Sequence, residues 1–141
     1  MQPESVAHAL QAAVSPVILI SAYGLLLLSM TNRLGRAIDR ARKLAREPSD
    51  TSVLQIEIIM QRARWIRSAI LFTSIAITAA ALLVLVLFLA AFLALDLWVI
   101  VSVLFVASLA SLVISLGYFI VDLFRSLSAL EAEVASARKS G

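Results

Sequence analysis

The fold is decided by the stretch SPVILISAYGLLLLSMTNRLGRAIDRARKLAR, residues 15–46, which joins an apolar helix to a basic one without a break. Counted back to Leu10, the apolar part is about 21 residues long, or roughly 30 Å, which is enough to cross a bilayer core. The basic part is expected to end before Pro48, because the residue preceding a proline disfavours the helical conformation. The stretch therefore predicts a membrane-spanning helix, over about residues 10–31, that continues as an amphipathic helix outside the membrane.

The composition indicates the same class of protein. Of the 141 residues, 62% are hydrophobic, whereas a soluble domain of this length is nearer half apolar. The chain has room for one compact unit, so we expect a single membrane domain over residues 1–141. It contains no cysteine, which excludes disulfides, thiolate metal sites and a cysteine nucleophile.

Hydropathy predicts two further membrane spans. The apolar runs at residues 68–95 and 97–121 are long enough to cross a membrane, and Asp96 separates them. Residues 32–67 predict a helical hairpin that turns at Pro48, and residues 122–141 form a short tail. The sequence thus predicts an all-α integral membrane protein with three transmembrane helices and a helical hairpin between the first and second. The hairpin seam is expected to include Val53, Ile56, Met60 and Ala63.

The distribution of cations sets the expected topology. All 12 lysines and arginines fall in the hairpin or the tail, and the first of them is Arg33. Cytoplasmic segments carry such an excess, so the hairpin and the C-terminus are expected in the cytoplasm and the N-terminus outside. Each cation near the surface attracts anionic lipid headgroups by about 1 kcal/mol. Nucleic-acid binding is not expected, since the basic segment is tethered at the membrane and lacks interleaved aromatic side chains.

The polar side chains of the first helix gather on one face. At 100° per residue, they fall within about 60° of a single line, together with the small and apolar residues between them. We call this set the polar face. It comprises Glu4, His8, Gln11, Ser15, Leu19, Ala22, Leu26, Ser29, Arg33, Arg36 and Arg40.

Two interpretations of the polar face remain open. If several copies of the chain packed these faces around an axis, the faces would line an ion-conducting pore. Glu4 and His8 would form its outer entrance, Leu19 and Leu26 would be apolar constrictions, and the three arginines would ring the inner exit. Alternatively, the face is the packing seam of a three-helix bundle, where small residues let helices approach closely.

A second polar stripe lies on the third span. Its members are three or four residues apart, which suits interhelical packing with hydroxyls bonding across helices. The stripe comprises Ser108, Ser111, Ser115 and Tyr118. The expected partners on the second span are Thr73, Ser74 and Thr78. Asp122, near the inner boundary, is expected to pair with a cytoplasmic arginine such as Arg67 or Arg33.

The sequence carries no pattern of enzyme chemistry. His8 and Ser15 lack a glycine-flanked elbow and a third orienting group, so a hydrolytic site is not supported. Glu4 and His8 supply only two metal ligands, fewer than metal sites use. There is no glycine-rich phosphate loop and no ionisable residue at the centre of a span. We therefore expect no enzyme activity, no cofactor and no bound metal.

A family resemblance is carried by the run LQAAVSPVILISAYGLLLLSMTNRLGRAIDRAR, residues 10–42. The chain resembles a family of small bacterial membrane proteins known as domain of unknown function 2721, most specifically in TNRLGRAIDRAR, Thr31 to Arg42. The likeness extends to about residue 130. It implies three membrane helices in a bacterial inner membrane, and it implies no activity, substrate or site residue.

Two functions are consistent with these patterns. The first is a homo-oligomeric ion-conducting pore lined by the first helix, whose partners are further copies of the chain and permeant ions. The second is a non-conducting membrane scaffold whose basic hairpin binds anionic lipid or a cytoplasmic partner. Stoichiometry separates them, because a pore needs several copies around an axis and a scaffold does not.

Overall fold

The computed structural model describes the backbone of residues 3–46 and 50–139, and the side chains of residues 7–46, 53 and 55–126. Three helices make up this part of the chain: α1 over Pro3–Arg46, α2 over Asp50–Leu93 and α3 over Trp98–Lys139. Each contains a stretch long and apolar enough to cross a membrane. The prediction of an all-helical chain with three such helices is confirmed, and this is the architecture of a multi-pass membrane protein.

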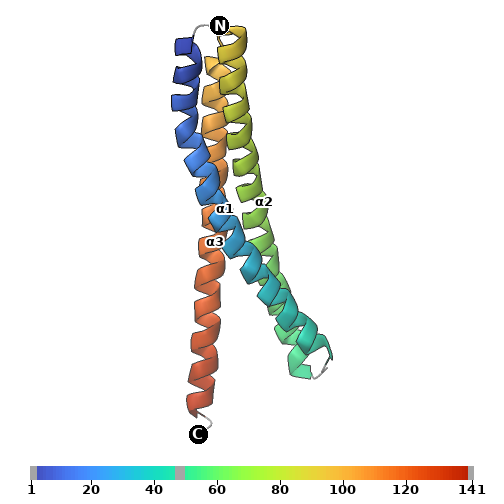
Figure 1. Ribbon diagram of the computed structural model, residues 1–141. Helices are drawn as coiled ribbons and strands as arrows, with labels where there is room; N and C mark the ends of the chain where they lie inside the picture. Colours follow the sequence, from blue (N-terminus) through green and yellow to red (C-terminus); the bar gives the residue numbers. More distant parts are fainter. Residues whose placement is uncertain (1–2, 47–49, 140–141) are drawn as a thin grey trace.

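The central helix is α2, which packs against both α1 and α3. The three helices run side by side over the upper half of Figure 1, where the α2–α3 turn lies near the start of α1. In the lower half, α1 and α2 stay together and diverge from α3. We call these diverging ends, residues 33–46 and 50–62, the hairpin arm. In the segment expected as a tail after residue 121, α3 continues as one helix to Lys139.

Buried residues recur at every seventh position on all three helices. A seven-residue period keeps one stripe of each helix facing its neighbours in a near-parallel, left-handed packing. The repeat comprises Ala9, Pro16, Tyr23 and Met30 on α1, Ile59, Ile66, Thr73 and Ala80 on α2, and Ser108, Ser115 and Asp122 on α3. Between the α2 positions lie fully buried Ala69 and Ala76, whose small side chains allow close approach of the backbones.

On α2, the register of the hairpin-arm seam is shifted by one residue from the predicted register. Ile59 is buried, whereas Met60 and Val53, both expected in the seam, are 55% and 67% exposed. Spacing within the arm alone does not distinguish neighbouring registers. The observed register extends the seven-residue repeat that Ile66 and Thr73 establish inside the bundle.

The α2–α3 turn ends α2 with a Schellman motif. The Leu95 N–H donates to the Ala90 carbonyl at 3.2 Å, and Ala94 between them has a φ of 51°. Glycine usually occupies this left-handed position, because a Cβ crowds the next carbonyl oxygen at a cost of about 1 kcal/mol. The turn places Asp96 in an exposed position at that end of the bundle.

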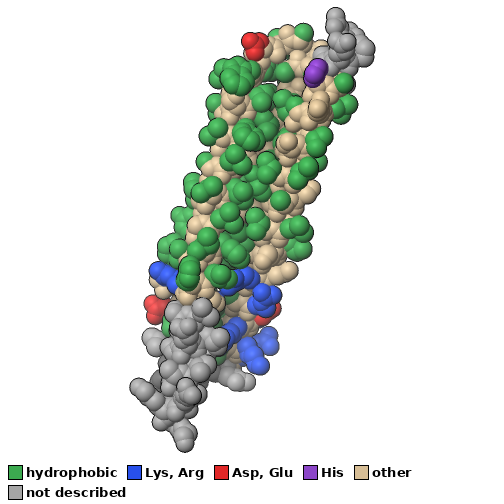
Figure 2. All heavy atoms as spheres, turned by 90° about the vertical axis from the view of Figure 1, so that its left-hand side faces the viewer, with side chains coloured by type: hydrophobic (Ala, Val, Ile, Leu, Met, Phe, Trp, Pro, Cys, Tyr) green, Lys and Arg blue, Asp and Glu red, His purple; other side chains and the backbone are tan. Residues whose placement is uncertain are grey.

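Charged side chains gather at the ends of the bundle. Figure 2 shows hydrophobic side chains over its length and the lysines and arginines in a band near its lower end. The described cations run from Arg33 to Arg46 on α1 and from Arg62 to Arg67 on α2, with Arg125 on α3. His8 and Asp96 lie at the opposite end. The bundle is therefore electrically polarised along its axis.

Candidate functional site

Serine 108 forms the first of three polar layers at the buried positions of α3. Its Oγ donates to the carbonyl oxygen of Ala76 on α2 at 3.0 Å. The hydroxyl of Tyr23 on α1 lies 3.5 Å from the same Oγ, and both side chains are buried. This layer joins all three helices, and the methyl-sized side chain of Ala76 leaves its carbonyl accessible to Ser108.

Serine 115, two turns along α3, forms the second layer. Its Oγ lies 2.7 Å from the Ala69 carbonyl oxygen and 2.6 Å from Thr73 Oγ1. The Ala69 carbonyl oxygen also lies 3.1 Å from Thr73 Oγ1, so one of the two hydroxyls donates to the other, and the second donates to Ala69. The sulfur of Met30 on α1 lies 3.6 Å from Thr73 Oγ1 and closes the layer. A fully buried hydroxyl pair is thereby satisfied without water.

Aspartate 122 forms the third layer, and here the buried position holds a charge. Its side chain is fully buried. Its Oδ2 lies 3.2 Å from Nη2 of Arg33 on α1, and its Oδ1 lies 3.5 Å from Nε of Arg62 on α2. One carboxylate on α3 is thus paired with an arginine from each of the other helices. We call these three side chains the charge cluster.

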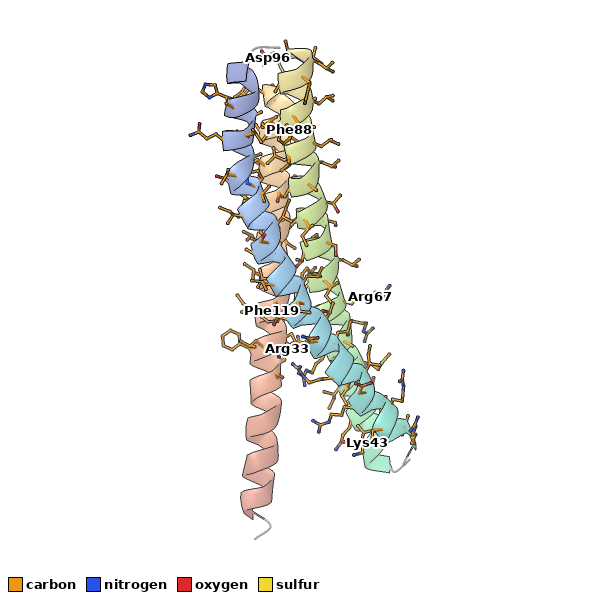
Figure 3. The ribbon with its side chains drawn as sticks, in the orientation of Figure 1. Arg33, Lys43, Arg67, Phe88, Asp96 and Phe119 are labelled. Atoms are coloured by element: carbon orange, nitrogen blue, oxygen red, sulfur yellow. The ribbon has the colours of Figure 1, made fainter. Side chains whose placement is uncertain are left out.

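Further contacts hold the two arginines of the charge cluster in place. Arg62 Nη2 donates to Ser126 Oγ at 2.5 Å, and the Arg33 guanidinium lies over the Phe119 ring, 5.3 Å from its centroid. Among the described residues, neither Asp122 oxygen has an aligned hydrogen bond. Attraction between opposite charges therefore holds the cluster. Figure 3 labels Arg33 and Phe119 at the level where the hairpin arm leaves α3.

The charge cluster joins the three helices where they begin to separate. A buried carboxylate is costly unless it is paired, so removing either kind of partner leaves an uncompensated charge. Ionisable residues within membrane-spanning segments are rare and commonly mark functional sites. The cluster offers a single carboxylate, and nowhere in the described chain do three metal-ligating side chains gather.

The predicted pairing of Asp122 with Arg33 is confirmed, and the second partner is Arg62. Arg67, the other arginine proposed from sequence, is exposed. The sequence did contain a signal for this cluster. Ser108, Ser115 and Asp122 are seven residues apart, as are members of a buried heptad stripe.

The other two members of the predicted α3 stripe, Tyr118 and Ser111, are half-buried, whereas Ser108 and Ser115 are buried. Tyr118 packs in an aromatic group on α2, with its ring centroid 5.6 Å from that of Trp65 and 5.7 Å from that of Phe72. Arg125 lies over Trp65 at 5.1 Å. Tyr118 also packs against the buried cluster of Met30, Ile66 and Ala69.

Of the three hydroxyls expected to pair with α3, only Thr73 does so among the described residues. Ser74 and Thr78 instead donate to carbonyls one turn back in α2, those of Ile70 and Ser74, both at 2.9 Å. A hydroxyl on a helix can always satisfy itself in this way, so residue type alone does not reveal interhelical bonds. Position in the heptad decides which hydroxyl reaches the neighbouring helix.

The polar face lies mostly on the outside of the bundle. α1 runs through Pro16 as one helix, so the face remains continuous. Its exposed members are His8, Gln11, Ser15, Ala22, Ser29, Arg36 and Arg40, and its half-buried members are Leu19, Leu26 and Arg33. The side chain of Glu4 lies outside the described residues. The packing seam of α1 lies roughly a quarter turn away, along Ala9, Pro16, Tyr23 and Met30. Within one chain, the polar face is therefore not the packing seam of the three-helix bundle.

Comparison with known proteins places these features in a family. No curated protein and no solved structure matches the chain. The family model described as protein of unknown function, DUF2721, matches residues 13–132, which include the three polar layers and the polar face from Ser15 onward. The chain therefore belongs to the DUF2721 family.

Proposed function

We propose that the chain forms a homo-oligomeric, ion-conducting pore lined by α1 in a bacterial inner membrane. The observation that carries the proposal is the exposure of the polar face on the outside of the bundle. Facing lipid, the Gln11 amide would lack water and a partner from another helix, and the Ser15 and Ser29 hydroxyls could bond only to carbonyls of their own helix. Small and polar residues are enriched where membrane helices pack together, so we expect a second copy of the chain to pack against the polar face. Around an axis, these faces enclose a polar path.

The proposed orientation places the hairpin arm and the C-terminus in the cytoplasm and the N-terminus outside. It is supported by the described cations, which lie toward the hairpin-arm end of the bundle (Figure 2). Positive residues are retained on the cytoplasmic side during insertion. In this orientation Arg36 and Arg40 stand at the inner mouth of the pore and His8 at the outer one.

Ion flux through reconstituted protein tests the proposal. Purified protein in planar bilayers should carry discrete currents under an applied voltage. Ser29→Leu should reduce the unitary current, because a leucine removes a hydroxyl and narrows the polar path. Absence of current under voltage, tension and changed pH contradicts the proposal.

Ser21→Leu is the matched control. Ser21 lies on the same helix two turns above Ser29 and is also exposed, but off the polar face, and its Oγ donates to the Val17 carbonyl at 3.3 Å. The substitution adds the same apolar group within the same membrane-spanning helix. It should leave the unitary current unchanged, and an equal loss in both variants would show that the polar face does not line the path.

A second candidate function is a non-conducting scaffold that binds anionic lipid through the hairpin arm. It is favoured by a separate observation, the exposure of Arg64 and Arg67, which flank Trp65 in the sequence at the boundary of the apolar zone. Cations there attract lipid phosphates. Mass measurement in mild detergent separates the candidates, since the scaffold is satisfied by a monomer and the pore requires several copies.

A further inference from the structure

Arginine 33 differs from the other two arginines of the polar face. By angle all three belong to one line, and all belong to one uninterrupted helix. Arg36 and Arg40 are exposed, whereas only 20% of the Arg33 side chain is exposed. The helix backbone does not account for this difference. It arises from the groups that α3 places beside Arg33.

Two side chains of α3 hold Arg33. The Asp122 carboxylate lies 3.2 Å from Nη2 and attracts it by charge, and the Phe119 ring lies 5.3 Å from the guanidinium carbon and attracts it by a cation–π contact. Since Asp122 is fully buried, water does not compete for its charge. The guanidinium is therefore directed toward α3.

We infer that Asp122 is a positioning residue, which holds the Arg33 guanidinium against α3 and away from the polar face. The inference rests on the proposed pore. The inner mouth then presents Arg36 and Arg40, in place of the ring of three arginines expected from sequence, and the Asp122 carboxylate offsets one of the two positive charges of the cluster. Neutralising Asp122 releases Arg33 and adds one positive charge per copy at the mouth. A cluster of positive charge at a narrow entrance concentrates anions and repels cations.

The chloride-to-potassium permeability ratio measures this charge directly. It is obtained from reversal potentials under a KCl gradient across bilayers containing the full-length protein. Asp122→Asn should raise the ratio several-fold, and Asp122→Glu, which keeps the charge, should leave it near the wild-type value. Arg33→Gln added to Asp122→Asn should bring the raised ratio back, because the released charge is then absent. A general loss of structure would not be reversed in this way.

Arg36→Gln is the matched control for Arg33→Gln, since both remove one arginine from the same face of α1. Arg36→Gln should lower the permeability ratio more than Arg33→Gln does. This comparison leaves Asp122 intact, so it does not depend on how Asp122→Asn folds. Wild-type protein without current overturns the pore itself. If the wild-type protein conducts, two results overturn the positioning role alone. One is a permeability ratio that Asp122→Asn leaves unchanged, and the other is an equal effect of Arg33→Gln and Arg36→Gln on that ratio.

Discussion

The Asp122 carboxylate of α3 lies 3.2 Å from the guanidinium of Arg33 on α1, and its side chain is fully buried. This pair connects the first and last helices, which otherwise meet mainly through α2. Arg33 stands at the level where the hairpin arm leaves α3 (Figure 3). The position of the arm relative to α3 therefore depends on a few charged atoms.

Asp122→Asn should destabilise the protein by about 3 kcal/mol, because two partly buried arginines lose their counter-charge. The free energy of unfolding in a detergent titration followed by circular dichroism measures the loss. Asp96→Asn is the control, since Asp96 is exposed in the α2–α3 turn, and its effect should stay within about 0.5 kcal/mol. Equal effects of the two variants would show that the charge cluster contributes little to stability.

Thr73→Val and Ser115→Ala should not be additive. The two hydroxyls lie 2.6 Å apart in a buried layer, and an interhelical hydrogen bond of this kind contributes about 0.6 kcal/mol of coupling. A double-mutant cycle on the free energy of unfolding measures it. The cycle of Thr78→Val with Ser115→Ala serves as reference, because Thr78 bonds within its own helix. The same coupling in both cycles would contradict the second layer as described.

Ala94→Gly should stabilise the protein by about 1 kcal/mol, because Ala94 has a φ of 51° and glycine adopts this conformation without strain. Ala91→Gly, one turn earlier inside α2, should instead destabilise it by about 0.5 to 1 kcal/mol. Opposite signs in thermal unfolding are the expected result. Destabilisation by both substitutions would mean that the α2–α3 turn is not strained at Ala94.

Ala22→Phe should separate the oligomer into smaller species, because a large ring on the polar face prevents close approach of two copies. Mass measurement of the protein in mild detergent gives the number of chains. Leu28→Phe is the matched control: Leu28 is 57% exposed but lies on the opposite side of α1, so its replacement should leave the assembly intact. A wild-type monomer, or dissociation by Leu28→Phe alone, is incompatible with assembly through the polar face.

Sequence was sufficient for the three helices, because long apolar runs are strong local signals, and for the expectation that Asp122 pairs with an arginine such as Arg67 or Arg33. It was insufficient for the register. The angular position of Ser15 on α1 is clear from sequence, yet the buried side of the helix lies roughly a quarter turn away, at Pro16 and Tyr23. Which face packs depends on what the other helices present. For the same reason, Arg62 rather than Arg67 reaches Asp122.

The pore is tested most directly by single cysteines along α1, since the chain has no cysteine of its own. A charged, membrane-impermeant thiol reagent is applied to both sides of bilayers containing Ser29→Cys or Ser21→Cys protein while the current is recorded. The proposed pore predicts rapid block of the Ser29→Cys current and no block of the Ser21→Cys current. No current in either variant, or block that does not distinguish them, would contradict a pore lined by the polar face.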